Sequence, residues 1–309
     1  MDATTVRTGI GCLMLILLCA ASASAQIEDQ LSVYTGANAI GYMQPLADAF
    51  GADLNASLFH SAEIARIGFH FRLEFPIMGV IFSDDDRTFT AVTEGDFSPE
   101  QRVQAPTIIG SGEAKVVTGY GGTSYAFPGG FDLNSFAIAV PQLRIGSVFG
   151  TEAILRYFSI NTGDVELGDL GLFGFGIRHS VSQYLGPVFP VDIAAGFFWQ
   201  KFKLGENKDG DDLISVKAFT IGVQASKKFA VFVPYTGLSY DTSSMDVAYV
   251  NDSSGAEERI DLDFDSTKTV HWTIGMMIDL IYLNAFAEYN IAGQSSFSFG
   301  LGIGFGVGI

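Results

Sequence analysis

Three polar residues at alternate positions are the first candidates for chemistry in this 309-residue chain. His70, Arg72 and Glu74 alternate with apolar residues between Ile67 and Ile77. Successive side chains of a β-strand point to opposite faces, so the three polar groups would share one face. Charged groups on an enclosed face must pair or meet water. The pattern therefore predicts either an internal ion-pair network or a polar surface that grips a solute or a plug, and both interpretations stay open.

The same alternation places further side chains on inward faces of strands expected later in the chain. The polar members are Arg144, Arg178, Asp192, Gln200, His271 and Glu288, and the apolar members are Phe136, Ile138, Val140, Ile154, Phe158, Phe198 and Phe286. The apolar set could line a site for a lipophilic solute. It could equally be the packing partner of another part of the chain.

One cluster combines a nucleophile with a base. His179 lies next to Ser180 and three positions before Ser182. Neighbouring residues on a strand diverge, so His179 and Ser180 would point to opposite faces unless the chain turns there. Without a recognisable lipase motif, we predict that the protein is not an enzyme, and a lipid hydrolase remains the second alternative function.

An acidic stretch, Asp209-Gly210-Asp211-Asp212, partly matches a calcium-binding loop. The full series of oxygen ligands is missing, and an exposed hairpin turn is the expected structure. We therefore predict no metal site and no cofactor.

Residues 1–25 have the pattern of a secretory signal peptide. Arg7 precedes an apolar run from Ile10 to Ala21, and small residues form a cleavage site before residue 26. The run is too short for a spanning helix. Cys12 and Cys19 both lie in this segment, so the mature chain would have no disulfide and no cysteine metal site.

The composition is both acidic and apolar. The net charge is −17, yet the mean hydropathy is +0.30 and the chain has 27 phenylalanines. Such acidity disfavours nucleic acid and anionic membrane surfaces as partners, since both require clustered Lys and Arg. With no apolar run long enough for a spanning helix after the leader, the chain could cross a membrane only as a closed barrel.

The last thirteen residues give the clearest strand pattern. Seven apolar residues alternate with Ser298 and five glycines over 297–309. A lipid-facing apolar side and a crowded interior side explain this pattern, with a buried sandwich strand as the alternative. Further strands are expected at Arg66–Ile77, Thr88–Thr93, Phe136–Ser147, Thr151–Asn161, Gly171–Arg178, Val191–Lys203, Leu213–Ser226, Ala230–Tyr240 with an extension to Val250, Arg259–Asp279 and Leu283–Ile291.

Connections between these strands alternate in length. Tight connections at 148–150, 227–228 and 280–281 interleave with acidic or glycine-rich ones at 206–212 and 251–258. Bacterial outer-membrane barrels have this arrangement, with short periplasmic turns and longer outer loops. Eleven strands can be named and closure requires an even number, so we expect one more near 103–109. The predicted fold is an all-β, antiparallel transmembrane β-barrel of about 12 strands, with ten to fourteen in range.

The segment before the first strand lacks alternation. Pro45 would start a short helix that ends at Gly51, with Leu46 and Phe50 on one side. The segment is either a periplasmic tail or a plug that enters the barrel. We expect a plug at 26–62, including Asn55, followed by the barrel at 63–309.

Three stretches carry a resemblance to a known group: 42–56, 176–184 and 233–240. They resemble bacterial outer-membrane β-barrels, most nearly the long-chain fatty-acid transporter superfamily and an uncharacterised barrel family related to it. In the transporters an N-terminal hatch with an Asn-Pro-Ala turn fills the barrel, whereas Asn55-Ala56 here lacks the proline.

The resemblance implies a place in the outer membrane and passive passage of a small hydrophobic molecule. The implied partners are the outer-membrane lipid bilayer, the barrel-assembly machinery and a small lipophilic solute. The first alternative is a structural or surface-displayed barrel that transports nothing.

Overall fold

The computed structural model describes residues 31, 34, 36–161, 169–185, 190–206, 212–251, 258–264 and 269–308. The predicted signal peptide at 1–25 and residues 209–211 of the acidic stretch lie outside this part. Among the described residues, no helix is both long and apolar enough to cross a membrane.

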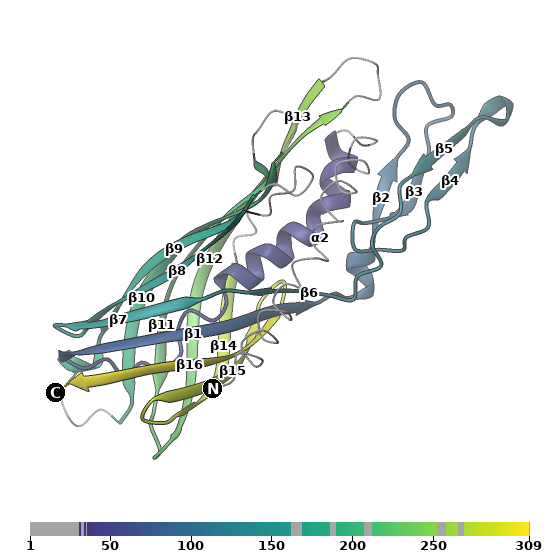
Figure 1. Ribbon diagram of the computed structural model, residues 1–309. Helices are drawn as coiled ribbons and strands as arrows, with labels where there is room; N and C mark the ends of the chain where they lie inside the picture. Colours follow the sequence, from purple (N-terminus) through teal and green to yellow (C-terminus); the bar gives the residue numbers. More distant parts are fainter. Residues whose placement is uncertain are drawn as a thin grey trace, which may run out of the picture.

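Ten antiparallel strands form a closed ring, and the predicted barrel is confirmed (Figure 1). The ring runs from β1 through β7, β8, β9, β10, β11, β12, β14, β15 and β16, and β16 pairs with β1 again. These strands are β1 (Ile67–Ile81), β7 (Gln142–Val148), β8 (Thr151–Asn161), β9 (Asp169–Ser180), β10 (Asp192–Glu206), β11 (Asp212–Ser226), β12 (Phe232–Asn251), β14 (Thr269–Asp279), β15 (Leu283–Ile291) and β16 (Ser296–Gly308).

The remaining elements are not strands of the ring. They are α2 (Gly36–Asn55), η1 (Asp84–Arg87), β2 (Thr88–Val92), β3 (Arg102–Pro106), β4 (Lys115–Thr118), η2 (Tyr120–Gly122), β5 (Ser124–Phe127), β6 (Ser135–Ala139), η3 (Ser182–Tyr184) and β13 (Glu258–Phe264).

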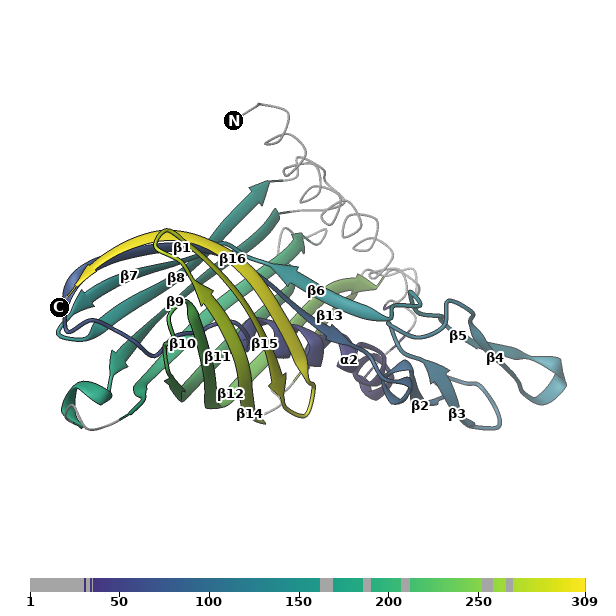
Figure 2. The ribbon, with the colours of Figure 1, turned by 90° about the horizontal axis from the view of Figure 1, so that it is seen from below.

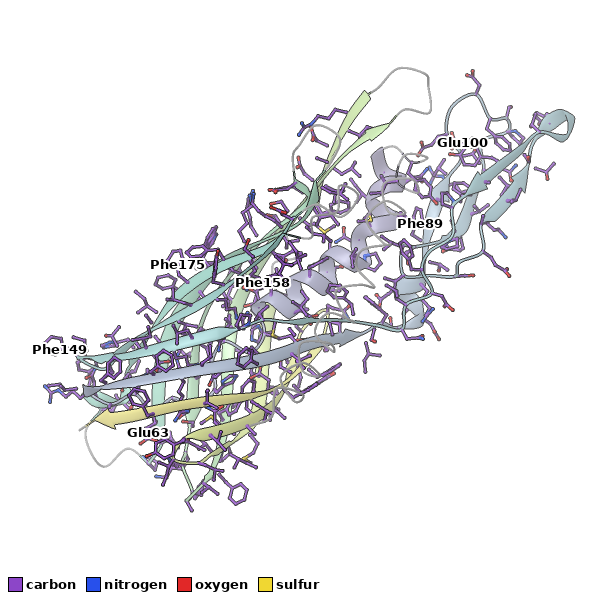
Figure 3. The ribbon with its side chains drawn as sticks, in the orientation of Figure 1. Glu63, Phe89, Glu100, Phe149, Phe158 and Phe175 are labelled. Atoms are coloured by element: carbon purple, nitrogen blue, oxygen red, sulfur yellow. The ribbon has the colours of Figure 1, made fainter. Side chains whose placement is uncertain are left out.

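The outer face of the ring is apolar, as the alternation predicts. Phe175 on β9 is 42% exposed, whereas Arg178 on the same strand is 3% exposed. Figure 3 shows Phe175 on the outer side of the wall, and Phe158 on β8 near α2. Trp272, Leu301 and other large apolar side chains continue this exposed surface around the barrel.

Glycines on β16 face a crowded interior, as predicted. A Cβ atom added at Gly302 would lie 2.5 Å from the Asn284 Oδ1 atom and 2.8 Å from the Glu74 Cγ atom. Cβ atoms do not approach heavy atoms so closely, so the wall closes at this point only around glycine. The register places Glu74 directly opposite Gly302.

The two ends of the barrel differ. One end, called the turn end here, contains the connections at 149–150, 227–231 and 280–282, together with the start of β1 and the end of β16. The opposite end, called the loop end, contains α2, β13 and the two hairpins β2–β3 and β4–β5, which extend beyond the ring (Figure 2). The turn end also contains the longer connection at 181–191, and the loop end contains the short one at 292–295, so the predicted alternation of short and long connections is only partly present.

Three predicted strands have other boundaries or partners. The strand expected near 103–109 exists as β3, but it pairs with β2 outside the ring, so the ring has ten strands, within the predicted range of ten to fourteen. The strand expected at Phe136–Ser147 is divided into β6 and β7 near Pro141, because proline supplies no N–H to a ladder. The strand expected at Arg259–Asp279 is two strands, which pair with different parts of β12.

The helix is longer than predicted, and the expected start at Pro45 is wrong. Helix α2 contains Pro45 in its interior. A mid-helix proline costs about 3 kcal/mol. Burial of large side chains such as Tyr42, Leu46, Phe50 and Leu54 contributes roughly 1.5–3 kcal/mol each and outweighs that cost. The Phe50 ring packs 4.7 Å from that of Phe136 on β6.

Candidate functional site

Among the described residues, a stretch of chain crosses the lumen between α2 and the start of β1. We call α2 and residues 56–62 together the plug. After Asn55 the plug continues toward the turn end, where β1 begins. Leu58 and His60 are 2% and 1% exposed, so this stretch is enclosed by the barrel wall.

Three arginines of the wall hold the plug by its backbone. Arg156 donates to the carbonyl oxygens of Leu54 at 2.9 Å, Ala56 at 2.8 Å and Ser57 at 3.1 Å. Arg144 donates to the Leu58 carbonyl and Arg178 to the Ser61 carbonyl, each at 2.9 Å. Two glutamines add to this set, since Gln200 donates to the Leu54 carbonyl and Gln224 to the Ser61 carbonyl. The plug is therefore fixed through carbonyl groups, which any sequence would supply.

Buried carboxylates balance two of these arginines. Glu74 accepts hydrogen bonds from Arg144 at 2.8 Å and from Gln142 at 3.0 Å. Glu152 accepts from Arg178, and its other oxygen lies 2.8 Å from the His70 Nε2 atom. Buried ions are tolerated in proteins when they are paired and hydrogen-bonded in this way.

Arg156 differs from the other two arginines. It is fully buried, and its hydrogen bonds go to plug carbonyls and to the side-chain oxygens of Gln142 and Gln200. Its guanidinium carbon also lies 5.4 Å from the centre of the Phe198 ring, within range of a cation–π interaction. Most of the hydrogen-bond acceptors of Arg156 therefore belong to the plug.

Glu288 on β15 binds the plug from the opposite side. Its carboxylate accepts a hydrogen bond from the Ser57 backbone N–H at 2.7 Å and from the Tyr235 hydroxyl at 2.9 Å. Asn290 and Ser298 donate at 3.3 and 3.4 Å. The wall therefore binds both donors and acceptors of the plug backbone.

The plug itself contributes His60 to this network of charged and polar side chains. Its ring stacks on Phe286 with 3.7 Å between ring centres, and its Nδ1 atom lies 2.9 Å from Arg144. Because Arg144 can only donate, Nδ1 accepts, and the Nε2–H of the neutral ring donates to the Ser57 hydroxyl at 3.2 Å. Burial, together with the positive charge of Arg144, lowers the pKa of His60.

Asp53 on α2 is buried without a hydrogen-bond partner for either carboxylate oxygen within the described part of the chain. Burial raises the pKa of this carboxyl group well above its ordinary value. The protonated acid is therefore the favoured form while the plug is in place.

Cavities lie on both sides of the plug. The turn-end cavity, of about 600 Å³, is lined by His60 and Ser61 of the plug and by polar wall residues. The loop-end cavity, of about 170 Å³, is lined by Asn55 and Ala56 of the plug, by the middle of β12 and by the ends of β14 and β15. The stretch between Ala56 and His60 thus separates two openings of one lumen.

The structure brings most predicted site residues to this plug and its cavities. His70, Arg72, Glu74, Arg144, Arg178 and Asp192 line the turn-end cavity, and His271 and the plug residue Asn55 line the loop-end cavity. Gln200 and Glu288 bind the plug backbone. Pro45, Leu46 and Phe50 lie on α2. Arg72 binds Asp279 at 2.8 Å rather than the plug.

The inward phenylalanines contact the plug or the residues that hold it. Phe136 packs on Phe50 of the plug, and Phe286 stacks on His60. Phe158 lies 6.5 Å from Phe202, which itself packs 5.2 Å from Phe50, with all distances between ring centres. Of the two interpretations of this apolar set, packing against the plug is the arrangement seen here.

Several residues of the network are missing from the sequence analysis: His60, Gln142, Glu152, Arg156 and Tyr235. A signal for two of them was available. Glu152 and Arg156 lie on the same face of β8 as Ile154 and Phe158, which the alternation predicts to point inward. His60 precedes the first strand, so the alternation of side chains along a strand cannot predict its direction.

The candidate nucleophile and base do not pair. His179 contacts the Thr151 hydroxyl at 2.8 Å and the Tyr184 hydroxyl at 2.9 Å, whereas the Ser180 hydroxyl lies 3.3 Å from that of Ser182. No hydrogen bond joins His179 to Ser180 or Ser182 in the described chain. Among the described residues there is also no group of three or more His, Cys, Asp or Glu that could hold a metal ion.

Comparisons with solved structures return outer-membrane barrels. The chain is similar to the outer-membrane protease OmpT from Escherichia coli, at 7% identity and a TM-score of 0.35, over 79% of this chain and 98% of that one. It is similar to the translocator domain of the autotransporter NalP from Neisseria meningitidis, at 10% identity and a TM-score of 0.32, over 86% and 99%. It is also similar to the Ralstonia pickettii toluene transporter TbuX, at 11% identity and a TM-score of 0.20, over 88% and 95%.

Sequence comparison assigns a family without a function. No curated protein matches the chain. The model of a family of unknown function, DUF6588, matches residues 6–305, which is nearly the whole chain. The chain therefore belongs to the DUF6588 family.

Proposed function

We propose that this protein is an outer-membrane barrel through which a small hydrophobic molecule passes when the plug moves. The exposed apolar side chains around the ring support a lipid-facing surface. By the usual arrangement of such barrels, the turn end would face the periplasm and the loop end the outside.

The observation that carries the proposal is the way in which the plug is held. Between Leu54 and Ser61 the wall binds it largely by hydrogen bonds to backbone groups, with a cavity on either side. Hydrogen bonds of this kind can be exchanged for water when the segment moves, because water satisfies the same carbonyls and guanidinium groups. A plug that seals the barrel permanently would not be expected to leave a cavity on each of its two sides.

The hydrophobic character of the solute is supported by the wall that α2 covers. Phe136, Phe158, Phe202 and Val216 form an apolar surface beside the helix. A shift of α2 would expose this surface to the lumen. The result would be an apolar route from the loop end to the level of Ser57.

No catalytic residue belongs to this proposal, and we propose that the protein is not a hydrolase. The alternative can be tested directly, since His179→Ala and Ser180→Ala would abolish fatty-acid release by a lipid hydrolase. A fatty-acid release that depends on either residue would replace the transport proposal.

The uptake of an apolar dye tests the proposed passage. Cells that express the protein are exposed to 1-N-phenylnaphthylamine, whose fluorescence rises on entry into membranes, and the entry rate is measured. Arg156→Gln removes three hydrogen bonds to the plug, so we expect faster entry than with the unchanged protein. Arg259→Gln, at an exposed arginine paired with Asp261, is the matched control and should leave the rate unchanged.

Two outcomes would contradict the proposal. If the unchanged protein and Arg156→Gln admit the dye no faster than cells without the protein, a barrel with no transport function is favoured. If Arg259→Gln accelerates entry as much as Arg156→Gln, the effect comes from lost charge and not from the plug. Insertion of each variant is checked by the resistance of the folded barrel to detergent denaturation.

A further inference from the structure

The two hairpins at the loop end belong to one unit. Residues 83–132, called the hairpin module here, contain η1, η2, β2–β3 and β4–β5, and the Tyr120 N–H of one part donates to the Ser98 carbonyl of the other at 2.8 Å. The chain leaves the ring at the end of β1 and returns at β6, which pairs with that same end of β1. A backbone hydrogen bond of 3.1 Å from Phe82 to Asn134 joins the two crossings. Both covalent links between the module and the ring therefore lie side by side.

The module is hydrogen-bonded to the first half of α2. The Asn38 side chain binds both the N–H and the C=O of Val92 on β2, at 3.0 and 2.6 Å. The Tyr42 carbonyl accepts from the Ile108 N–H at 2.9 Å, and the Tyr42 hydroxyl donates to the Gly129 carbonyl at 2.9 Å. Asn38 and Tyr42 are four residues apart, so both contacts come from one face of the helix.

Aromatic side chains fill the space between the helix and the module. Gly41 leaves room for Phe89, which lies on the side of β2 that faces α2 (Figure 3). The ring of Tyr34 lies 5.1 Å from that of Tyr42, 6.0 Å from that of Phe89 and 6.4 Å from that of Phe127, measured between ring centres. Tyr34, Tyr42 and Phe127 are fully buried. The helix and the module therefore share a packed core.

Separation of the helix from the module would be costly. Asn38 is 5% exposed, and separation would take from it and from the Val92 backbone the partners that they have in this core. Separation would also expose the three buried rings to water. Movement of the module together with the helix keeps all of these contacts. Among the described residues, the hydrogen bonds of the module to the rest of the chain go to α2 or to Leu133 and Asn134, so they allow bending at the two crossings.

We infer that the hairpin module and α2 move as one body when the plug moves. The inference rests on the proposed passage and adds a means of control to it. A contact that holds the module would hold the plug in the lumen, and a contact that displaces the module would draw the plug with it. The module would thus act as a lever at the loop end of the barrel.

Two single cysteines in the full mature chain test the shared movement. Ala91 is fully buried and shares a face of β2 with Phe89, so Ala91→Cys reports on the contact between the module and α2. Ala218 is 2% exposed on β11, a strand that α2 contacts, so Ala218→Cys reports on the contact between the plug and the wall. The rate of modification by a water-soluble maleimide is measured for each in detergent, with and without Arg156→Gln.

We expect Arg156→Gln to accelerate modification of Ala218→Cys by roughly tenfold or more, the factor expected for one lost hydrogen bond to a charged group. The rate at Ala91→Cys should not change. Adding Asn38→Ala, which removes the hydrogen bonds to β2, should then make Ala91→Cys several-fold more reactive. The matched control is Gln104→Ala, because the Gln104 side chain binds Thr90 within the same hairpin and not α2.

The possible results separate this inference from the proposed passage. If Arg156→Gln accelerates both cysteines equally, the plug leaves the module behind, and the inference is overturned while the passage stands. If it accelerates neither, the plug does not move, and both fail. The inference is also overturned if Gln104→Ala exposes Ala91→Cys as much as Asn38→Ala does. Detergent resistance of the folded barrel confirms that each variant is folded.

Discussion

Single residues decide how firmly the plug is held. Arg144, Arg156 and Arg178 bind five of its carbonyl groups, and His60 joins the plug to Arg144. The sequence reveals which wall residues point inward, because period-two alternation is local. It cannot reveal that their partners are backbone carbonyls of residues 54–61, since every residue type has the same carbonyl group. Arg156 is therefore visible as an inward charge, but its role is visible only in the folded chain.

His60 makes the hold on the plug dependent on pH. Its pKa in the plugged state lies below the ordinary value, so the released state binds a proton more readily. The stabilisation is complete above the ordinary pKa of about 6.5 and is lost as the pH falls from there toward the lowered pKa. Glu74 at 3.7 Å, Glu288 at 3.9 Å and Arg144 at 2.9 Å are the charged groups that face the ring.

The His60 contribution therefore favours release of the plug at about pH 5 over about pH 8, whereas Asp53, whose pKa is raised in the plugged state, favours release at the higher pH. In an Asp53→Asn background, which removes the opposing contribution, dye entry should be faster at the lower pH, and adding His60→Gln, which cannot be protonated, should make the difference between the two much smaller. His179→Gln is the control, because His179 lies on β9 away from the plug and contacts Thr151 and Tyr184. A pH response that survives in His60→Gln but disappears in His179→Gln would contradict this role.

At the scale of elements, the strands of the ring could be predicted well and the connections poorly. Ring strands such as β9 and β16 keep the same alternation along their length, and each was expected within a few residues of its position. The short strands β2 and β3 have the same local pattern but pair with each other outside the ring. Alternation identifies a strand and does not identify its partner, which explains why ten ring strands are found where about twelve were expected.

Helix α2 shows the opposite effect, in which packing overrides a local signal. Proline favours the first turn of a helix, so Pro45 suggested a start there. The helix instead begins at Gly36, because residues on both sides of Pro45 bury apolar side chains against the wall and the outer hairpins. Gly41, for example, allows Phe89 of β2 to approach within 2.4 Å of where a Cβ atom would be.

Crowding explains why the inner face of β16 consists mainly of glycine, and a substitution at Gly302 tests this explanation. Gly302→Ala would place a methyl group against Asn284 and Glu74, and overpacking of this kind typically costs about 1–3 kcal/mol. We expect a lower midpoint of urea unfolding for the barrel. Gly293→Ala, where no heavy atom lies within 4 Å of an added Cβ, should leave the midpoint nearly unchanged. Equal effects at the two positions would contradict crowding as the reason for glycine at position 302.

At the scale of the whole molecule, a closed ring with an apolar exterior surrounds a plug that leaves a cavity at each end. The closed ring could be inferred from composition and alternation, because an acidic chain with this many outward apolar residues has few other ways to bury them. A plug at 26–62 is also expected from the loss of alternation there, but the strands that it contacts could not be inferred, since residues 36–62 give no signal of which part of the wall faces them. Whether the plug moves is the central question for function.

The most direct measurement is the conductance of single barrels whose plug can be locked. An ideal Cβ atom on Gly51 of α2 lies 3.1 Å from the Ser243 Cβ atom on β12, near the roughly 3.5–4.5 Å of a disulfide. The predicted mature chain has no cysteine, so Gly51→Cys with Ser243→Cys creates a single reversible bond. Ser243→Cys alone is the control. We predict channels that are silent when oxidised and that open after a reductant is added, whereas equal conductance before and after reduction would contradict a passage opened by plug movement.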